Sequence, residues 1–357
     1  MTKNHNFYLD LAYQLAEQNL GKTGLNPSVG AVVVRDDAVI SSGITSKNGR
    51  PHAEFNALKK LKNCSGASLY TTLEPCVHFG ETPPCTDIII KKKIKNVYFG
   101  SYDPDSRSFK KAISVLKKKN INAKKIQSTN YKDFYKSYLI NRKIKIPFIS
   151  AKIAISNDFY TINKKKRWIT NELSRKTAHL IRSRYDCILS TSKTINVDNS
   201  LLNCRIEGLN KFKPDLFIID LNLKLKKKLL LNTLLRKRKT YIITNKSNYK
   251  KVNTYKIKGY KILFVDSLKN KEDFYSLYNI IFKLGYSRIL LETGLIFLKY
   301  VIENKLINKV YLFKSNEKLK KKGKNNISPN FLKKIKFKPI SINLKTDKLL
   351  SKIIKNV

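Results

Sequence analysis

The most constraining feature of the chain is a pair of short segments that supply one imidazole, one carboxylate and two thiols. The first segment contains His52 and Glu54, and the second contains Cys76 directly after Pro75, followed by Cys85. A His-x-Glu pair together with a Pro-Cys…Cys segment is the ligand and proton-carrier set of zinc deaminases. The pattern therefore predicts removal of an exocyclic amine from a ring by a zinc-activated water.

The residue types fit an open catalytic metal site. His52, Cys76 and Cys85 are the expected ligands of one zinc ion per chain, and three protein ligands leave the fourth tetrahedral position for water. Zinc lowers the pKa of such a water to about 7. Glu54, two positions beyond His52, is expected to carry protons. We expect His52 and Cys76 to lie where helices begin, since Pro75 suits a first helical turn and helix N-termini favour thiolates.

Two other interpretations of the same residues stay open. A closed structural zinc site would take Cys64 or His78 as a fourth ligand, and a weaker alternative is chance placement of two cysteines. A closed site leaves Glu54 without a role beside the metal, so catalysis is the favoured interpretation. The five cysteines are odd in number and scattered, which argues against a disulfide framework.

Length and composition favour a two-domain enzyme. The chain has 357 residues, 42% of them hydrophobic, and we expect domains over 1–145 and 146–357. No stretch approaches the length of a membrane-spanning helix, and residues 1–6 lack an apolar signal region. We therefore expect a soluble, cytoplasmic protein without a membrane partner.

The formal net charge of +48 raises the question of nucleic-acid binding. The lysines are spread over the whole chain, and runs such as 91–93, 164–167 and 318–324 are typical of solvated faces. Nucleic acid is thus the less favoured partner, and a phosphorylated small molecule would still be attracted. A basic nucleic-acid-binding protein with structural zinc remains an alternative.

Periodicity predicts an α/β fold in both halves, because segments of strand and helix pattern alternate. Strands are expected over 29–35, 38–43, 68–73 and 96–100, then over 148–155, 187–190, 215–220, 240–244, 261–265, 288–292 and 309–313. Helices are expected over 7–20, 52–61, 86–93, 109–118 and 131–141, then over 172–182, 271–284 and 295–304. Residues 337–343 are a candidate edge strand.

The first half resembles a known family over several motifs. They comprise Asn26-Pro27 and Val29-Gly30, the segments 51–54 and 72–76, then His78, Gly80, 82–85 and Asp103-Pro104. This combination is similar to the bifunctional riboflavin biosynthesis proteins, a pyrimidine deaminase fused to a reductase. The resemblance implies a cytidine-deaminase-like three-layer domain, zinc on His52, Cys76 and Cys85, and Glu54 as proton donor. It also implies that Asn26 lines the pocket, although a plain turn residue before Pro27 is an equal alternative.

Taken alone, the second half contains no glycine-rich dinucleotide fingerprint. Its one local hint is Glu292-Thr293-Gly294 between a strand and a helix, where a helix N-terminus attracts phosphate. The family resemblance implies a dihydrofolate-reductase-like domain that uses NADPH to reduce a ribosyl group to ribityl. The implied nucleotide contacts are Ala154, Trp168, Thr194, Asp198 and Gly294, and the implied substrate contacts are Arg182, Leu202, Arg205 and Glu292. The implied substrate is 2,5-diamino-6-(5-phosphoribosylamino)pyrimidin-4-one, and a homo-oligomer is left open.

The chain departs from the family pattern at identifiable positions. Glu81 stands where the family has a basic residue expected to face the substrate, and residues 107–111 replace glycines. In the second half Phe159 stands where glycine is usual. The segment 163–167 is shortened and places Lys166 at a substrate-facing serine. These departures keep open a deaminase whose reductase domain is impaired.

Overall fold

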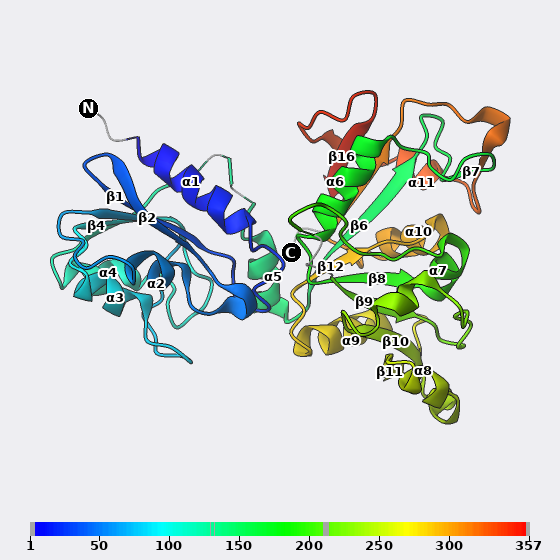
Figure 1. Ribbon diagram of the computed structural model, residues 1–357, viewed down its shortest axis with the longest axis horizontal. Helices are drawn as coiled ribbons and strands as arrows, with labels where there is room; N and C mark the ends of the chain where they lie inside the picture. Colours follow the sequence, from blue (N-terminus) through cyan, green and yellow to red (C-terminus); the bar gives the residue numbers. More distant parts are fainter. Residues whose placement is uncertain (1–3, 129, 132, 210–213, 355–357) are drawn as a thin grey trace. The chain divides into compact units, whose positions relative to one another are not determined.

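The computed structural model describes residues 4–128, 130–131, 133–209 and 214–354 (Figure 1). The chain divides into two compact units, Met1–Lys145 and Ile146–Val357. No helix among the described residues is long and apolar enough to cross a membrane.

The first unit is built on one five-stranded sheet with the order β2-β1-β3-β4-β5. The strands are β1 Gly30–Arg35, β2 Ala38–Ile44, β3 Ser68–Leu73, β4 Asn96–Ser101 and β5 Asn122–Lys125. β1 is antiparallel to β2 and β3, whereas β3, β4 and β5 run parallel. Asp36 and Asp37 both have positive φ in the β1–β2 turn, the conformation that a tight two-residue hairpin needs.

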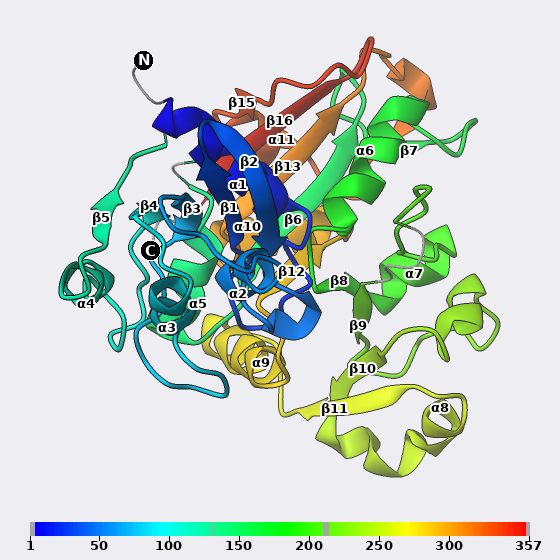
Figure 2. The same ribbon diagram turned by 60° about the vertical axis from the view of Figure 1, so that its left-hand side comes forward.

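Helices cover both faces of this sheet (Figures 1 and 2). They are α1 His5–Glu17, α2 Ala53–Leu58, α3 Cys85–Lys91, α4 Ala112–Lys117 and α5 Lys136–Ile144. Val32 and Val34 share a buried cluster with Ala12 of α1, while Ala31 and Val33 belong to the cluster that contains Ala57 of α2. β1 is therefore buried on both faces, which explains its nearly continuous apolar sequence.

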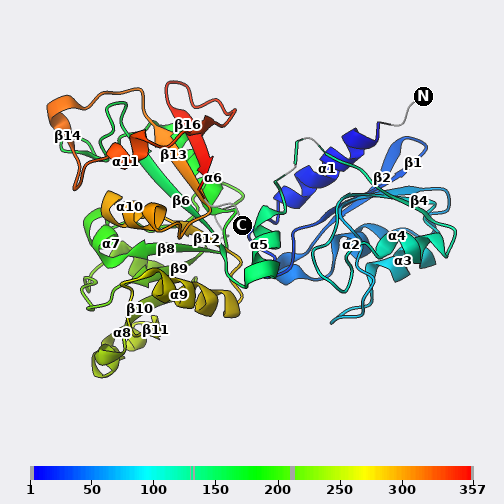
Figure 3. The ribbon, with the colours of Figure 1, turned by 180° about the vertical axis from the view of Figure 1, so that it is seen from behind.

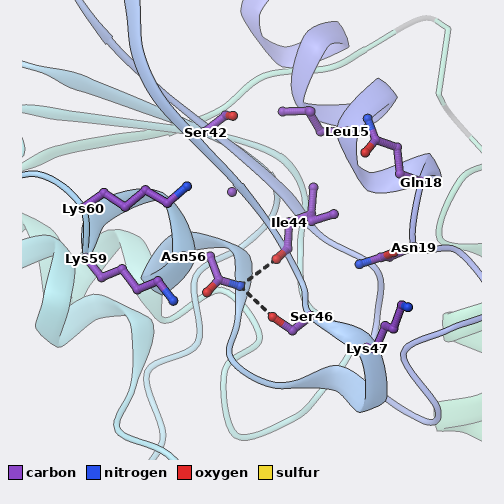
Figure 4. Close-up of a pocket in the computed structure, with 11 residues that line it drawn as sticks. Leu15, Gln18, Asn19, Ser42, Ile44, Ser46, Lys47, Asn56, Lys59 and Lys60 are labelled. Carbon is purple, nitrogen blue, oxygen red and sulfur yellow. Dashed lines mark hydrogen bonds between the residues drawn. The ribbon is translucent and has the colours of Figure 1, made fainter.

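Helix α2 lies unusually close to the edge strand β2. A Cβ added to Gly43 would lie 2.3 Å from the carbonyl oxygen of Ala53, so only glycine permits this approach. Asn56 of α2 donates hydrogen bonds to the Ile44 carbonyl at 2.8 Å and to the Ser46 hydroxyl at 2.9 Å (Figure 4). The helix that follows His52 is thereby fixed to the sheet.

The second unit contains a nine-stranded sheet with the order β11-β10-β9-β8-β12-β6-β13-β16-β15, and a separate β14-β7 pair. The strands are β6 Phe148–Ile155, β7 Ile162–Asn163, β8 Cys187–Thr191, β9 Asp215–Ile219, β10 Thr240–Asn245, β11 Lys261–Val265, β12 Arg288–Leu291, β13 Lys309–Lys314, β14 Gly323–Lys324, β15 Lys338–Pro339 and β16 Lys348–Ile353. Neighbours from β11 to β13 run parallel, whereas β16 is antiparallel to β13 and β15. Parallel strands bring their carboxyl ends to one edge, where open α/β sheets bind ligands.

Helices also flank both faces of the second sheet. They are α6 Glu172–Arg182, α7 Ser192–Asp198, α8 Asn253–Ile257, α9 Lys271–Lys283, α10 Leu295–Glu303 and α11 Asn330–Lys333. α6 packs on one face through Ala178 and Ile181, in a cluster with Ile188 and Leu290. Seen from behind, α9 and α10 lie over the other face (Figure 3).

Several predicted elements differ from those in the structure. The predicted helix 109–118 is shortened to α4, and the predicted helix 131–141 begins only at Lys136, with residue 132 outside the described residues. Within the predicted edge strand 337–343, only β15 forms, and it does lie at the edge. β5, α7 and β16 had no clear sequence pattern. β16 has the sequence Lys-Leu-Leu-Ser-Lys-Ile, which lacks a clear alternation, and its pairing with β13 determines its structure.

The close approach of α2 to β2 can be tested by adding one methyl group at Gly43. We expect Gly43→Ala to lower the free energy of unfolding by about 2 kcal/mol or more, because the Cβ collides with backbone. It should also reduce the zinc bound per chain, because α2 carries Glu54 and follows His52. Urea unfolding and metal analysis measure both effects. Ser42→Ala, at the exposed neighbouring residue, should change stability by less than about 0.5 kcal/mol; equal stability of the two variants would contradict the packing argument.

Candidate zinc centre and reductase site

Three ligand atoms of the first unit converge on one point. His52 Nδ1 lies 3.3 Å from Cys85 Sγ and 3.7 Å from Cys76 Sγ, and the three atoms all lie within 4.8 Å of one another. Zinc–sulfur bonds of about 2.3 Å and zinc–nitrogen bonds of about 2.0 Å in a tetrahedron separate ligand atoms by roughly 3.5 Å. The spacing and the donor set therefore fit zinc.

Each ligand is held by a different local structure. His52 is the N-cap residue of α2, as expected, and Cys85 opens α3 after the N-cap residue Pro84. The expectation that Cys76 opens a helix is wrong, because Cys76 lies in an irregular segment after β3 and Pro75 begins no helix. The α3 N-terminus still serves Cys76, since the Cys85 backbone N–H donates to Cys76 Sγ at 3.2 Å. The Cys85 side chain also lowers the pKa of the Cys76 thiol to about 4.

Glu54 is placed as a proton carrier next to the ligands. It lies in the first turn of α2, with only 4% of its surface exposed. Burial raises the pKa of its carboxyl group to about 7, partly offset by the neighbouring His52. A carboxyl group with a pKa near neutrality can both accept and donate a proton at physiological pH.

The two candidates for a fourth protein ligand lie elsewhere. Cys64 is fully buried in the apolar core of the unit, and burial raises the pKa of its thiol. His78 Nδ1 shares a hydrogen bond of 2.8 Å with the Ser108 hydroxyl. Within the described part of the chain, the metal-ligand group therefore contains three residues, which supports an open site.

Asn26 lies beside the segment that leads to the metal ligands. A Cβ added to Gly49 would come within 2.2 Å of the Asn26 side-chain nitrogen, so the two residues are in direct contact. Gly49 adopts a φ of +93° in the short helix η1 (Lys47–Gly49), three residues before His52. Whether Asn26 reaches the substrate stays a prediction.

The loop after β4 is held by a buried carboxylate. The buried carboxylate of Glu74 accepts backbone hydrogen bonds from Asp103, Lys110 and Ala112 at 3.0–3.3 Å. Lys110 has a φ of +59°, the region in which glycine is favoured. A lysine thus occupies a left-handed position, held there by the Glu74 carboxylate.

Arg50 also lies at this site, although no sequence motif indicated it. Arg50 lies 3.3 Å from His52 and pairs with Glu81 and Thr82. It stands before Pro51 and outside the quoted motif, so only its contacts single it out.

In the second unit two of the predicted substrate residues, Arg182 and Glu292, form a buried charge cluster with Lys152 and Asp198. Arg182 makes a bidentate pair with Glu292, at 2.5 and 2.9 Å. Lys152 of β6 lies 3.6 Å from the same carboxylate. Asp198, at the end of α7, interacts electrostatically with Lys152 and Glu292, and burial raises the pKa of its carboxyl group. The structure thus brings four charged residues from β6, α6, α7 and the end of β12 together.

Asn203 joins the two predicted substrate arginines and was missed in the sequence. Its carbonyl accepts from Arg182 at 3.1 Å, and its side-chain oxygen accepts from Arg205 at 2.8 Å. Leu202 is 4% exposed and belongs to the same apolar cluster against which Ala154 packs.

The remaining predicted nucleotide residues lie at helix starts and on the surface. Thr194 is in the first turn of α7, where its backbone N–H binds the Thr191 hydroxyl. Gly294 is the N-cap of α10, with open space where a Cβ would be. Trp168 is 50% exposed, and the guanidinium of Arg167 lies over its ring. Arg167 also interacts electrostatically with Asp198 and Arg205.

The comparisons with known proteins agree with both sites. Residues 2–101 match the cytidine and deoxycytidylate deaminase zinc-binding region, and residues 147–315 match the RibD C-terminal domain. The riboflavin biosynthesis protein RibD of Aquifex aeolicus is 36% identical over 276 residues, which cover 74% of this chain and 75% of that protein. RibD of Actinobacillus pleuropneumoniae is 28% identical and covers 86% and 82%.

Solved structures match over the full length. A diaminohydroxyphosphoribosylaminopyrimidine deaminase/5-amino-6-(5-phosphoribosylamino)uracil reductase from Thermotoga maritima is 26% identical, with 97% of both chains covered and a TM-score of 0.80. RibD of Acinetobacter baumannii shares the fold, with a TM-score of 0.82 over 99% of both chains at 24% identity. The predicted pair of folds, deaminase-like and then dihydrofolate-reductase-like, is confirmed. The chain therefore belongs to the RibD family, the bifunctional deaminases and reductases of riboflavin biosynthesis.

Proposed function

We propose that residues 1–145 deaminate 2,5-diamino-6-(5-phosphoribosylamino)pyrimidin-4-one and that residues 146–357 then reduce the ribosyl group of the product to ribityl with NADPH. The observation that carries this proposal is the three-ligand group of His52, Cys76 and Cys85 next to the buried Glu54. Membership of a family with both activities supports the second step.

In the first reaction the chain supplies the metal ligands and a proton carrier. Zinc, when bound by these three residues, supplies the Lewis acid that activates water at neutral pH. Glu54, buried and with a pKa of about 7, accepts a proton from the attacking water and gives it to the departing amine. Ammonia leaves, and a carbonyl oxygen replaces the exocyclic amine of the ring.

In the second reaction we assign the nucleotide to five residues: Ala154, Trp168, Thr194, Asp198 and Gly294. The open space at Gly294 and the N-terminus of α10 fit a phosphate group. The Asp198 and Thr194 oxygens of α7 can bind ribose hydroxyls, and Trp168 offers an exposed apolar face. The nicotinamide ring supplies the hydride, and the residues of this unit orient it.

We assign the substrate of the reductase to Arg182, Leu202, Arg205 and Glu292. Arg182 donates two N–H groups to Glu292. Arg205 is more exposed, and its guanidinium is therefore better placed to bind the substrate phosphate. The shortened segment before Trp168 is joined at its start to β14, through the pairing of Asn163 with Gly323 and a hydrogen bond of 2.9 Å from the Lys164 N–H to the Lys322 carbonyl.

Glu54 can be tested by a change that removes its proton and keeps its shape. Glu54→Gln should lower kcat of the deaminase about 10²–10⁴-fold, because an amide cannot transfer the proton. Zinc content, measured on the same protein, should stay at one ion per chain. Asp37→Asn makes the same chemical change at an exposed turn and should keep the rate within about two-fold. A Glu54→Gln protein with bound zinc and full deaminase rate would refute the assignment.

Arg205 can be tested in the reductase reaction alone, with the deaminated intermediate and NADPH. Arg205→Ala should raise the KM for the intermediate about ten-fold or more, since a charge-assisted contact to phosphate is lost. Steady-state NADPH oxidation gives this value. Arg236→Ala, at an exposed arginine of the same unit, is the matched control. An unchanged KM in Arg205→Ala removes this residue from the substrate site.

The low pKa of Glu292 leads us to expect that the stability of the second unit depends on pH. Burial opposes its ionisation, but the charges of Arg182 and Lys152 lower the pKa to about 2 from an ordinary value of 4.5. The ionised carboxylate therefore stabilises the unit above pH 4.5, by on the order of 3 kcal/mol, and this is lost as pH falls towards 2.

Acid unfolding of Glu292→Gln tests this dependence. The variant should be less stable than the wild type at pH 7 and should lose less stability between pH 4.5 and 2. Glu303→Gln breaks an exposed ion pair with Lys299 and should change stability by less than about 0.5 kcal/mol. Parallel pH curves for Glu292→Gln and the wild type would contradict the low pKa.

A further inference from the structure

Arg50 lies across the loop that separates the two cysteine ligands. Its Nη1 donates to the Thr82 hydroxyl at 2.7 Å and lies 3.3 Å from His52 Nε2. Its Nε lies 2.8 Å from a carboxylate oxygen of Glu81. The Arg50 side chain is 27% exposed, whereas that of Glu81 is 82% exposed. The guanidinium is thus built into the site, and its acidic partner lies in solvent.

The guanidinium of Arg50 has donor capacity that its neighbours do not use. Although Nε is close to Glu81, its N–H is not directed at the carboxylate, and this buried atom has no hydrogen-bond partner among the described residues. A guanidinium offers five N–H groups in a planar fork. Nη2 faces Gly80, where a Cβ would lie 3.6 Å away, so the loop adds no side chain on that side.

The contact between Arg50 and His52 also requires an acceptor. His52 Nδ1 faces the two sulfur atoms, so the neutral ring carries its proton on Nε2 when Nδ1 is a ligand. Arg50 Nη1 and His52 Nε2 are then two donors 3.3 Å apart, and they cannot bond to each other. Ligating histidines normally donate this second N–H to a carboxylate, a carbonyl or water. An anionic oxygen that accepts from both groups would satisfy the arrangement.

We propose that Arg50 binds the phosphate of the deaminase substrate, in place of the basic residue expected at position 81, and that Glu81 holds the guanidinium until the substrate arrives. A phosphate matches the planar fork of arginine in a bidentate geometry and carries more charge than a carboxylate. The carboxylate of Glu81 is 82% exposed, so water can solvate it when it leaves the guanidinium. The Thr82 hydroxyl, which accepts from Arg50, keeps its own proton for a second contact to the phosphate.

The inference rests on the proposed deaminase reaction and concerns which part of its substrate Arg50 recognises. The substrate offers two kinds of acceptor, the phosphate and the ring carbonyl. We therefore compare the phosphorylated substrate with its dephosphorylated ribosylamino counterpart on the zinc-loaded full chain. Arg50→Ala should raise KM about ten-fold or more for the phosphorylated compound, with kcat within about two-fold. KM for the dephosphorylated compound should not change.

Two further variants sharpen the result. The double variant Arg50→Ala/Glu81→Arg places a guanidinium at position 81 instead of position 50. It should recover at least part of the affinity for the phosphorylated compound that Arg50→Ala loses. Arg35→Ala removes an arginine that bonds to the Asn63 carbonyl in the same unit, and it controls for the loss of one positive charge. A ten-fold rise in KM for Arg35→Ala would show that general attraction, not Arg50, explains the effect.

Two measurements do not depend on turnover. Calorimetry with ribose 5-phosphate should show binding to the wild type that weakens about ten-fold in Arg50→Ala, and metal analysis should show unchanged zinc. Equal binding in both proteins, an equal KM loss for both compounds, or loss of zinc would each overturn the role in phosphate binding. A wild type without deaminase turnover would instead refute the proposed reaction, and the ribose 5-phosphate result would still decide on Arg50.

Discussion

The first unit depends on a single buried carboxylate that organises the backbone behind the metal site. Glu74 follows β3, two residues before Cys76, and accepts N–H groups from three points of the loop after β4. These donors would otherwise be buried without partners, which is costly. His78, two residues after Cys76, also contacts the loop after β4, through a hydrogen bond with the Ser108 hydroxyl. The position of Cys76 is therefore fixed from both sides by hydrogen bonds rather than by a helix.

The second unit uses the same device with a different kind of partner. Glu292 also follows a strand and is also buried, but it faces Arg182 and Lys152 instead of backbone donors. A buried carboxylate needs either hydrogen-bond donors or opposite charges as partners. Glu74 binds backbone N–H groups of its own unit, whereas Glu292 holds two cationic side chains after β12.

Residue type and spacing predicted that His52, Cys76 and Cys85 would come together with Glu54 beside them, and the structure shows this arrangement. The alternation of patterns likewise predicted two α/β units. The helix expected over 86–93 forms as α3 and begins one residue earlier, at Cys85, after the extended Pro84. Arg50 and Asn203 were missed because their roles follow from contacts across the fold, and nothing in their local sequence marks them. The strand β16 was missed because its pairing with β13 decides its structure.

The fold requires glycine more strictly at some positions of this chain than at others. At Lys110 and Phe159 a side chain occupies a left-handed conformation, so the backbone angle alone does not require glycine at these positions. At Gly30 and Gly43 a Cβ would lie 1.9 and 2.3 Å from a carbonyl oxygen, and no change of angle relieves that contact. A position that needs only a left-handed backbone angle can therefore accept a side chain. Gly30 and Gly43 cannot accept one, because each lies against the backbone of a neighbouring helix, at Ala12 of α1 and Ala53 of α2.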